Sequence, residues 1–306
     1  MQLDGRIALV GAGAVGLYYG TRLALAGEDV SFLLRSDFDV VKERGIRLES
    51  VDGDAELRNP QVFRDPGEIG RVDWVIVAWK ATANHHFAEV LSPLLHESTQ
   101  VLTLQNGLGN CEALQQVVGP DRVLGGLCFV CLNRLEEGFV RHTAGGKVTI
   151  GEWVPRPGIP RARRIAAAFS AAGVKAGAAE NLEHAQWRKL VWNVPFNGLA
   201  IAEGGVTTDQ LLADPEIEAD VAALMREVVA VAHAKGLEID PGVVDFEIER
   251  TRPMGAYRPS SMIDYVEGRS VEYEAIWGEP LRQAREAGVA VPRLEELAAR
   301  IRQRLG

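Results

Sequence analysis

The chain has 306 residues, of which 47% are hydrophobic and 25% charged, as in an ordinary globular protein with a sizeable core. A domain usually takes about 100 to 200 residues, so this length predicts two domains. The formal net charge of -9 at pH 7 argues against a general nucleic-acid or anionic-membrane binder, since an acidic protein repels both polyanions. An anionic ligand would therefore need local cations.

Cysteine and hydropathy patterns predict a chain of the reducing cytoplasm. The three cysteines (Cys111, Cys128 and Cys131) are too few for a disulfide framework, and neither they nor the six histidines show a metal-ligand spacing. We therefore predict packed, reduced thiols and no metal site. The first apolar run lacks a preceding basic region, and no run reaches the roughly 18 to 20 residues that span a bilayer. We expect no signal peptide and no membrane span.

The first 130 residues alternate short β-branched runs with helix-like segments. The runs lack polar alternation, which is typical of parallel strands that are covered on both faces. We predict strands at residues 7–10, 30–34, 74–79, 101–104 and 123–132. The predicted fold class is α/β, with an N-terminal Rossmann-type dinucleotide-binding domain built on a doubly wound sheet.

A different pattern follows the last of these runs. Residues 138–152 alternate around Gly145 and Gly146, which predicts a hairpin centred on those glycines. After this segment, a helix is expected to run to about Gly173. Beyond Asn181 the pattern is helical almost throughout, with one helix predicted over 215–236. We place the boundary in the poorly periodic stretch near 173–182, giving an N-terminal domain over 1–178 and an all-helical C-terminal domain over 179–306.

A glycine-rich turn follows the first predicted strand and begins a helix. Gly11 allows the tight turn, Gly13 lets backbone amides approach a pyrophosphate, and Gly16 lets helix and strand pack closely. The N-terminus of the helix attracts the phosphates. Because the motif stands between a strand and a helix, we interpret it as a dinucleotide site rather than a ligand-free turn.

The end of the second predicted strand indicates which dinucleotide is bound. Arg35 stands about 20 residues beyond the glycines, where an enzyme that uses NAD usually has an acidic residue for the ribose 2'-hydroxyl. A guanidinium there suits a 2'-phosphate, so the pattern favours NADPH/NADP. Asp37 is close enough to keep NAD open, and a solvated surface arginine is the simplest alternative.

Two later strand ends also carry polar residues. Lys80 follows the run at 74–79, and Asn106 follows the run at 101–104. Ligands of open α/β sheets lie outside the carboxyl ends of the strands, so both side chains are candidates for contact with cofactor and substrate. A surface lysine and an ordinary Asn-Gly turn are the alternatives.

Residues 184–200 form a mostly apolar predicted helix that carries three polar residues at four-residue spacing. Lys189, Asn193 and Asn197 would form one ridge, because i, i+4 and i+8 drift only about 40° around a helix. A buried lysine loses solvation and becomes a credible proton donor, while the amides can bind a substrate without adding charge. A solvated face is the alternative, although it is unusual among tryptophans.

A second polar cluster lies in residues 257–278. It contains Ser260, Ser261, Asp264, Arg269, Glu272 and Glu274. The serines could cap a helix, and Asp264 with Arg269 could form a simple salt bridge.

Together these residues resemble the ketopantoate reductase family (2-dehydropantoate 2-reductase) over nearly the whole chain. The landmarks are the glycine motif, Arg35, Lys80, Q-N-G at 105–107, W-R-K-L-x-x-N-x-x-x-N at 187–197, S-S-M-x-D at 260–264 and G-R-x-x-E at 268–272. The resemblance implies NADPH-dependent reduction of 2-dehydropantoate to (R)-pantoate, a step of pantothenate and coenzyme A biosynthesis.

The same resemblance implies a role for each landmark. Lys189 would protonate or polarise the C2 carbonyl oxygen, with Glu272 holding Lys189 or a substrate hydroxyl. Substrate would be bound by Asn106, Asn193, Asn197 and Ser261. Cofactor would be bound by Gly11, Gly13, Gly16, Arg35, Lys80 and Asn106.

Arg258 departs from the pattern, because a well-studied type of the family has an asparagine just before the serine pair. A guanidinium there could clamp the carboxylate of a different 2-oxo acid. Three functions therefore stay open: the ketopantoate reductase, an NADP(H)-dependent reductase of another 2-oxo acid, and a non-catalytic NADP-binding sensor. The expected partner is a small-molecule 2-oxo acid, with no nucleic acid and no membrane, and a homodimer is left open.

Overall fold

A computed structural model describes residues 3–306. Its contacts divide the chain into two compact units, here unit 1 (up to Asn106, and Asn110–Leu182) and unit 2 (Gly107–Gly109 and Glu183–Gly306). The predicted boundary after residue 178 falls inside a strand of unit 1, so the division comes slightly later, at Leu182. The three-residue segment Gly107–Gly109 belongs to unit 2, which no sequence pattern indicated.

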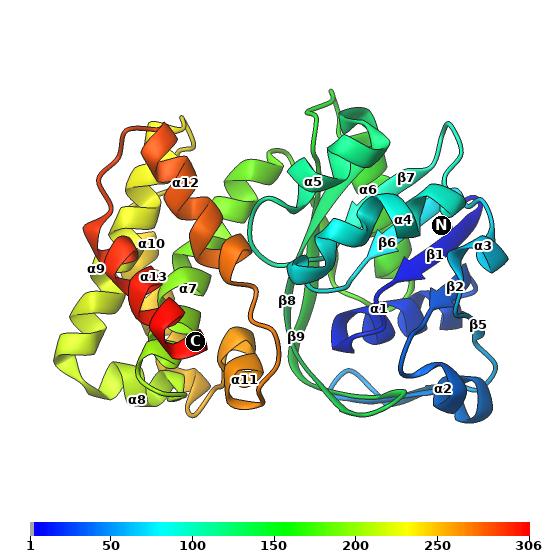
Figure 1. The fold of residues 1–306 in the computed structure, drawn as a ribbon, viewed down its shortest axis with the longest axis horizontal. Helices are drawn as coiled ribbons and strands as arrows, with labels where there is room; N and C mark the ends of the chain where they lie inside the picture. The colour runs from blue at the N-terminus through cyan, green and yellow to red at the C-terminus, as the bar shows by residue number, and fades with distance from the viewer. Residues whose placement is uncertain (1–2) are drawn as a thin grey trace. The chain divides into compact units, whose positions relative to one another are not determined.

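Unit 1 is built on one ten-stranded mixed sheet, coloured blue to green in Figure 1. The strand order is β4-β3-β9-β8-β7-β6-β1-β2-β5, and β10 pairs with β9. The strands are β1 (Arg6–Val10), β2 (Asp29–Leu33), β3 (Ile46–Ser50), β4 (Ala55–Leu57), β5 (Gln61–Phe63), β6 (Trp74–Val77), β7 (Gln100–Thr103), β8 (Val123–Glu136), β9 (Phe139–Glu152) and β10 (Ala176–Ala179).

The strands from β5 to β8 form the predicted doubly wound half of the sheet. Each neighbouring pair in the order β5-β2-β1-β6-β7-β8 is parallel, which confirms the Rossmann-type arrangement. All five predicted runs are strands. The sequence analysis missed β3, β4, β5 and β10, which are three to five residues long.

The predicted hairpin at Gly145 and Gly146 is wrong. Both glycines lie inside the single strand β9, which runs antiparallel to β8, and the chain reverses at Glu137 and Gly138 instead. The two glycines have positive φ angles of 79° and 104° and coincide with a shift in the β8–β9 register, between Phe129–Lys147 and Val130–Gly145. They therefore form a β-bulge, which uses the same left-handed conformations as a tight turn.

Helices cover both faces of this sheet. They are α1 (Ala14–Leu25), α2 (Phe38–Arg44), α3 (Pro66–Ile69), η1 (Ala81–His86), α4 (Phe87–Leu91), η2 (Ser92–Leu94), α5 (Asn110–Val118), η3 (Pro120–Arg122) and α6 (Pro160–Ala171). Helix α6 confirms the predicted helix that ends near Gly173. Alternate strand residues such as Ile7 and Leu9 join a core with Tyr19 of α1 and Phe169 of α6. Helix α5 contacts α4 and the strands β7 and β8.

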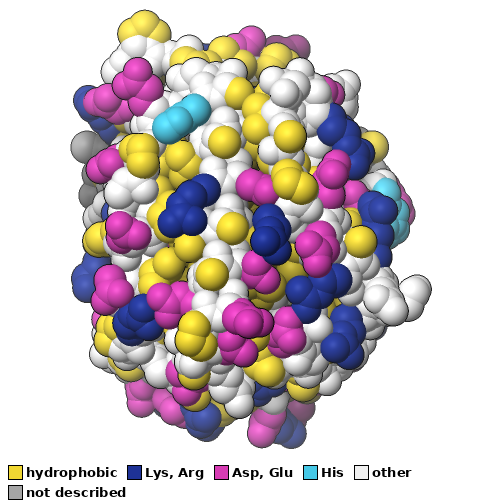
Figure 2. Space-filling view, turned by 90° about the vertical axis from the view of Figure 1, so that its left-hand side faces the viewer, with side chains coloured by type: hydrophobic (Ala, Val, Ile, Leu, Met, Phe, Trp, Pro, Cys, Tyr) yellow, Lys and Arg dark blue, Asp and Glu magenta, His cyan; other side chains and the backbone are white. Residues whose placement is uncertain are grey.

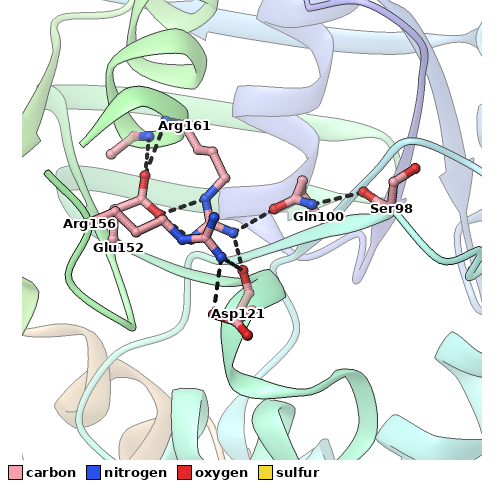
Figure 3. A network of polar contacts seen from close by, with 7 residues as sticks. Ser98, Gln100, Asp121, Glu152, Arg156 and Arg161 are labelled. Atoms are coloured by element: carbon pink, nitrogen blue, oxygen red, sulfur yellow. Dashed lines mark hydrogen bonds and ion pairs between the residues drawn. The ribbon is translucent and has the colours of Figure 1, made fainter. Parts of the chain in front are cut away.

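A polar network joins α6 to the ends of three other elements (Figure 3). Glu152 at the end of β9 is buried, and its carboxylate binds both the side chain of Arg161 and the first backbone amides of α6. Arg161 also donates to Gln100 of β7 at 2.6 Å and to the carbonyl of Asp121. The network fixes the start of α6 against the sheet.

Unit 2 is almost entirely helical beyond its three-residue segment, as predicted. Its helices are α7 (Leu182–Ala202), α8 (Thr208–Ala213), α9 (Pro215–Ala234), α10 (Val243–Thr251), η4 (Arg252–Met254), α11 (Ser260–Val266), the π-helix η5 (Glu274–Gly278), α12 (Glu279–Glu286) and α13 (Pro292–Leu305). Helix α9 confirms the helix predicted over 215–236. The core forms around α7, whose Trp187, Val191, Val194 and Phe196 are fully buried.

The face of the molecule in Figure 2 shows acidic and basic side chains interspersed, with small hydrophobic patches between them. Ion pairs of unit 2 include Arg293–Asp220 and Arg252–Glu218. Within residues 3–306, no helix has both the length and the apolar character needed to cross a membrane.

Candidate functional site

The glycine motif forms the turn between β1 and α1. Gly11 has a φ of 102°, and a Cβ atom there would lie 2.3 Å from the backbone nitrogen of Trp79. A Cβ on Gly16 would lie 2.0 Å from the carbonyl oxygen of Gly11, so α1 can approach the strand only with glycine here. These two contacts match the roles predicted for a tight turn and close helix–strand packing.

The space around Gly13 fits a phosphate group. Gly13 precedes α1, no side chain caps the helix there, and a Cβ built on Gly13 would have nothing within 4 Å. The first turn of α1 contains no acidic residue. Uncapped N–H groups at a helix N-terminus bind anions, and the missing side chain lets a pyrophosphate reach them. The residues present therefore fit a dinucleotide.

Arg35 lies in the connection 34–37 between β2 and α2, and its side chain is exposed. Among residues 3–306 its guanidinium has no hydrogen bond or ion pair. Asp37 is buried, and its carboxylate accepts hydrogen bonds from Arg134 (2.7 Å), Ser36 (2.7 Å) and the amide of Gly138 (3.2 Å). The acid that kept NAD open is thus engaged with the β8–β9 hairpin.

Lys80 and Asn106 follow β6 and β7, as predicted. A chain of amide hydrogen bonds, missed by the sequence analysis, links the loops that carry them. Gln105 donates to Asn84 of η1 at 2.7 Å, and Asn84 donates to Asn110 of α5 at 2.8 Å. Asn110 in turn donates to the carbonyl oxygen of Asn106 at 2.9 Å. The chain holds both strand ends in one fixed arrangement.

The cofactor residues predicted in unit 1 therefore gather at one edge of its sheet. Gly11, Arg35, Lys80 and Asn106 follow β1, β2, β6 and β7, and these are four adjacent parallel strands in the order β2-β1-β6-β7. Their carboxyl ends lie at the same edge, where open α/β sheets bind ligands.

In unit 2, α7 carries the predicted polar ridge on one continuous helix. Asn193 and Asn197 are buried, whereas Lys189 is only partly buried, less than its apolar neighbours suggested. Pro195 lies inside the helix without ending it. The ridge therefore runs from a partly buried lysine to two buried amides.

Asn197 connects α7 to the serine cluster. Its side-chain oxygen accepts a hydrogen bond from the backbone amide of Ser261 at 2.9 Å, and its nitrogen donates to the carbonyl oxygen of Asn193 at 3.0 Å. Ser261 is itself buried, in the first turn of α11. The amide of Asn197 thus holds α11 in place, a contact that the helical spacing did not indicate.

Glu272 is buried just before the π-helix η5. A π-helix frees backbone carbonyl groups from their usual partners and is often found at functional sites. Here the carbonyl oxygen of Ala275 accepts a hydrogen bond from the amide of Leu108 at 2.8 Å. A Cβ on Gly107 would lie 2.2 Å from the same oxygen, so this approach requires glycine after Asn106.

A further contact fixes the rotation of α7. Arg188 donates to the buried carboxylate of Glu247 in α10 at 2.6 Å, and the indole of Trp192 donates to Thr251 at 2.8 Å. Arg188 and Trp192 are four residues apart and share a side of the helix adjacent to the ridge of Lys189. The sequence analysis missed this ion pair, whose members are 59 residues apart.

The other polar residues have simpler roles. Asp264 and Arg269 form the salt bridge that was considered for them, with a distance of 2.9 Å. Arg258 is exposed, and its guanidinium has no hydrogen bond or ion pair within residues 3–306. No group of three or more His, Cys, Asp or Glu side chains among those residues could hold a metal ion.

Unit 1 is a Rossmann-type unit with open space at Gly13 of its glycine turn, and unit 2 is a helical unit with a ridge of one lysine and two amides. Together with the relatives of the chain, these features define an oxidoreductase that uses a nicotinamide cofactor. The comparisons with known proteins specify the family. The family models "Ketopantoate reductase PanE/ApbA" and "Ketopantoate reductase PanE/ApbA C terminal" match residues 7–155 and 181–305. The chain belongs to the ketopantoate reductase family.

Individual relatives agree with this assignment. The chain is 39% identical to a 2-dehydropantoate 2-reductase of Nostoc sp., over 94% of this chain and 92% of the relative. A crystal structure of 2-dehydropantoate 2-reductase from Geobacter metallireducens is 45% identical, with a TM-score of 0.95 and coverage of 97% and 99% of the two chains. A D-mandelate dehydrogenase solved with NADH and anilino(oxo)acetate shares the fold, with a TM-score of 0.89 and 24% identity over 100% of this chain and 98% of that one.

Proposed function

We propose that this protein reduces 2-dehydropantoate to (R)-pantoate with NADPH, in the route to pantothenate and coenzyme A. The observation that carries the proposal is the ridge of Lys189, Asn193 and Asn197 on α7, together with the contact between Asn197 and Ser261. The relatives named 2-dehydropantoate 2-reductase support the choice of substrate.

The proposed reaction transfers a hydride and a proton. When bound, a reduced nicotinamide would supply the hydride for the new C–H bond at C2 of the 2-oxo acid. The C2–oxygen π bond breaks, negative charge develops on that oxygen, and the ammonium group of Lys189 donates the proton that makes the hydroxyl. Glu272 holds either Lys189 or a substrate hydroxyl.

The remaining residues bind and orient. We assign Asn106, Asn193, Asn197 and Ser261 to the substrate, with Ser261 on its carboxylate. Unit 1 is the proposed cofactor domain, with Gly11, Gly13 and Gly16 at the pyrophosphate, Arg35 at the 2'-phosphate, and Lys80 and Asn106 towards the rest of the cofactor. The engagement of Asp37 by Arg134 favours NADPH, because it leaves Arg35 as the available charge in the connection.

Arg258 favours a second candidate, the reduction of another 2-oxo acid, because its exposed guanidinium could bind a carboxylate. The test is a panel assay that follows consumption of the reduced nicotinamide. The substrates are 2-dehydropantoate, pyruvate and the 2-oxo acid whose reduction gives mandelate, each tested with NADPH and with NADH.

We expect the highest kcat/KM with 2-dehydropantoate and NADPH. A higher value for another acid would support the second candidate. Consumption with none of the acids, despite NADPH binding, would leave only a non-catalytic sensor.

A further inference from the structure

Two acids lie close to Arg35 along the chain, Asp37 in the connection between β2 and α2 and Asp39 in the first turn of α2, and an arginine from elsewhere in unit 1 binds each one. Asp37 is bound by Arg134 of β8 at 2.7 Å, and Asp39 is bound by Arg64, which follows β5. Three guanidinium groups therefore accompany two carboxylates. These five side chains together carry a net charge of +1, in a protein whose net charge is -9.

Asp37 is the residue that could bind a ribose 2'-hydroxyl in competition with binding of a 2'-phosphate by Arg35. Its position in the chain brings it close enough to do so. Two residues span at most about 7 Å, so the backbone of Asp37 lies within that distance of Arg35. A carboxylate at this end of the second strand is the usual partner of a 2'-hydroxyl. Here the Asp37 side chain is only 2% exposed, and its carboxylate already accepts three hydrogen bonds.

Arg134 is the cationic member of that set. It lies near the end of β8, where its register partner is Val140, close to the turn at Gly138. The amide of Gly138 binds the same carboxylate, so Asp37 fixes both the hairpin end and the guanidinium. Arg134 uses only Nη1 for this contact and its side chain is 40% exposed, which leaves the other N–H groups available.

We propose that Arg134 is a specificity-determining residue that selects a cofactor with a 2'-phosphate. It neutralises Asp37, which would otherwise repel the phosphate and accept the 2'-hydroxyl of NADH, and it adds a second guanidinium near Arg35. The inference rests on the proposed use of NADPH and assigns that preference to a residue 97 positions from its partner Asp37.

The test measures dissociation constants for NADPH and NADH, and for 2',5'-ADP and 5'-AMP, with wild type and the variants R134Q, R134K, R35Q and D37N/R134Q. The matched control is R156Q. Arg156 also lies in unit 1, is likewise 40% exposed, and is paired with Asp121.

We expect R134Q to lower the preference for NADPH over NADH by about tenfold. The variant loses the positive charge of Arg134 and leaves the negative charge of Asp37 without its partner. The dissociation constants of NADPH and 2',5'-ADP should rise, whereas NADH should bind as tightly as to wild type or more tightly. R134K should retain part of the preference, and D37N/R134Q should regain part of it. R156Q should match wild type.

The inference is overturned if R134Q keeps the wild-type preference while R35Q loses it. It is equally overturned if R134Q weakens NADPH and NADH by the same factor, which would mean a purely structural role. A wild-type protein with no preference for NADPH would refute the proposed cofactor itself, and that result is read before any variant is made.

Discussion

At the scale of single residues, the two asparagines of the α7 ridge differ in their contacts. Asn197 uses its side chain within the protein, as acceptor for the amide of Ser261 and donor to Asn193. Asn193 is also buried, but within residues 3–306 its side chain makes no hydrogen bonds like those two. We therefore expect Asn197 to serve the proposed substrate site mainly by positioning Ser261 and α11, and Asn193 to be the amide that contacts the substrate directly.

This difference predicts opposite effects of two alanine variants. Asn197→Ala leaves a buried amide of Ser261 without its acceptor and should lower the free energy of unfolding by about 2 kcal/mol. Asn193→Ala should raise the KM for the 2-oxo acid with a smaller loss of stability. Urea denaturation and steady-state kinetics on both variants measure the contrast. A more stable Asn197→Ala than Asn193→Ala would contradict it.

At the scale of elements, the rotation of α7 decides where its ridge points. Successive helical residues are about 100° apart, so fixing Arg188 and Trp192 against α10 also fixes Lys189 and Asn193. Glu247 is the centre of this contact, because its buried carboxylate binds both Arg188 and Arg250.

Glu247→Gln tests this element contact. The substitution keeps the shape and removes the charge that two guanidinium groups share, so we expect the free energy of unfolding to fall by about 3 kcal/mol. The expected loss of kcat is larger than any change in NADPH affinity, because the proposed pyrophosphate and 2'-phosphate residues are in unit 1. Glu249→Gln on the same helix is the control, since Glu249 forms an exposed pair with Arg252. Equal stability of the two variants would refute the proposal that Glu247 fixes α7 against α10.

Elements were predictable from the sequence where the local pattern decides the structure. The strands β1, β2, β6, β7 and β8 show as mostly apolar runs without polar alternation, and α9 has both a starting Pro215 and a glycine just after its end. Gly145 and Gly146 led to the wrong prediction of a hairpin, because positive φ angles occur in a β-bulge as well as in a tight turn. Only the pairing of β9 with β8 along its length distinguishes the two.

The candidate site was predictable for a similar reason and only in part. Side chains at strand ends and at four-residue helical spacing were found, because position along one element determines where they face. The contacts that hold them were not. Asp37 with Arg134, Arg188 with Glu247 and Asn197 with Ser261 join residues 97, 59 and 64 positions apart, and no local pattern encodes such pairs.

At the scale of the whole molecule, buried tyrosines set an alkaline limit to stability. Burial raises the pKa of Tyr19 far above its usual value of 10, and Cys128 nearby adds to the shift. Burial also raises the pKa of Tyr18. Folding therefore favours the neutral phenols. Their contribution is fully present below pH 10 and is lost as the pH rises further, because only the unfolded chain ionises there.

Tyr19→Phe tests this limit. Above about pH 10, each such tyrosine should lower the free energy of unfolding by about 1.4 kcal/mol per pH unit. The variant should therefore show a shallower decline than wild type between pH 10 and 11, and a constant offset between pH 7 and 9. Denaturant titrations across that range measure both slopes. Parallel declines above pH 10 would count against a buried neutral phenol at this position.

The measurement that tests the proposed reaction most directly is the turnover of Lys189→Ala with 2-dehydropantoate and NADPH, beside the NADPH dissociation constant of the same variant. Lys189 is partly buried in unit 2, whereas the proposed pyrophosphate and 2'-phosphate residues all lie in unit 1. We predict that kcat falls by about 10²- to 10⁴-fold, because the proton donor is lost, while NADPH affinity changes by less than about threefold. Turnover equal to that of wild type would contradict the assignment of Lys189 as proton donor.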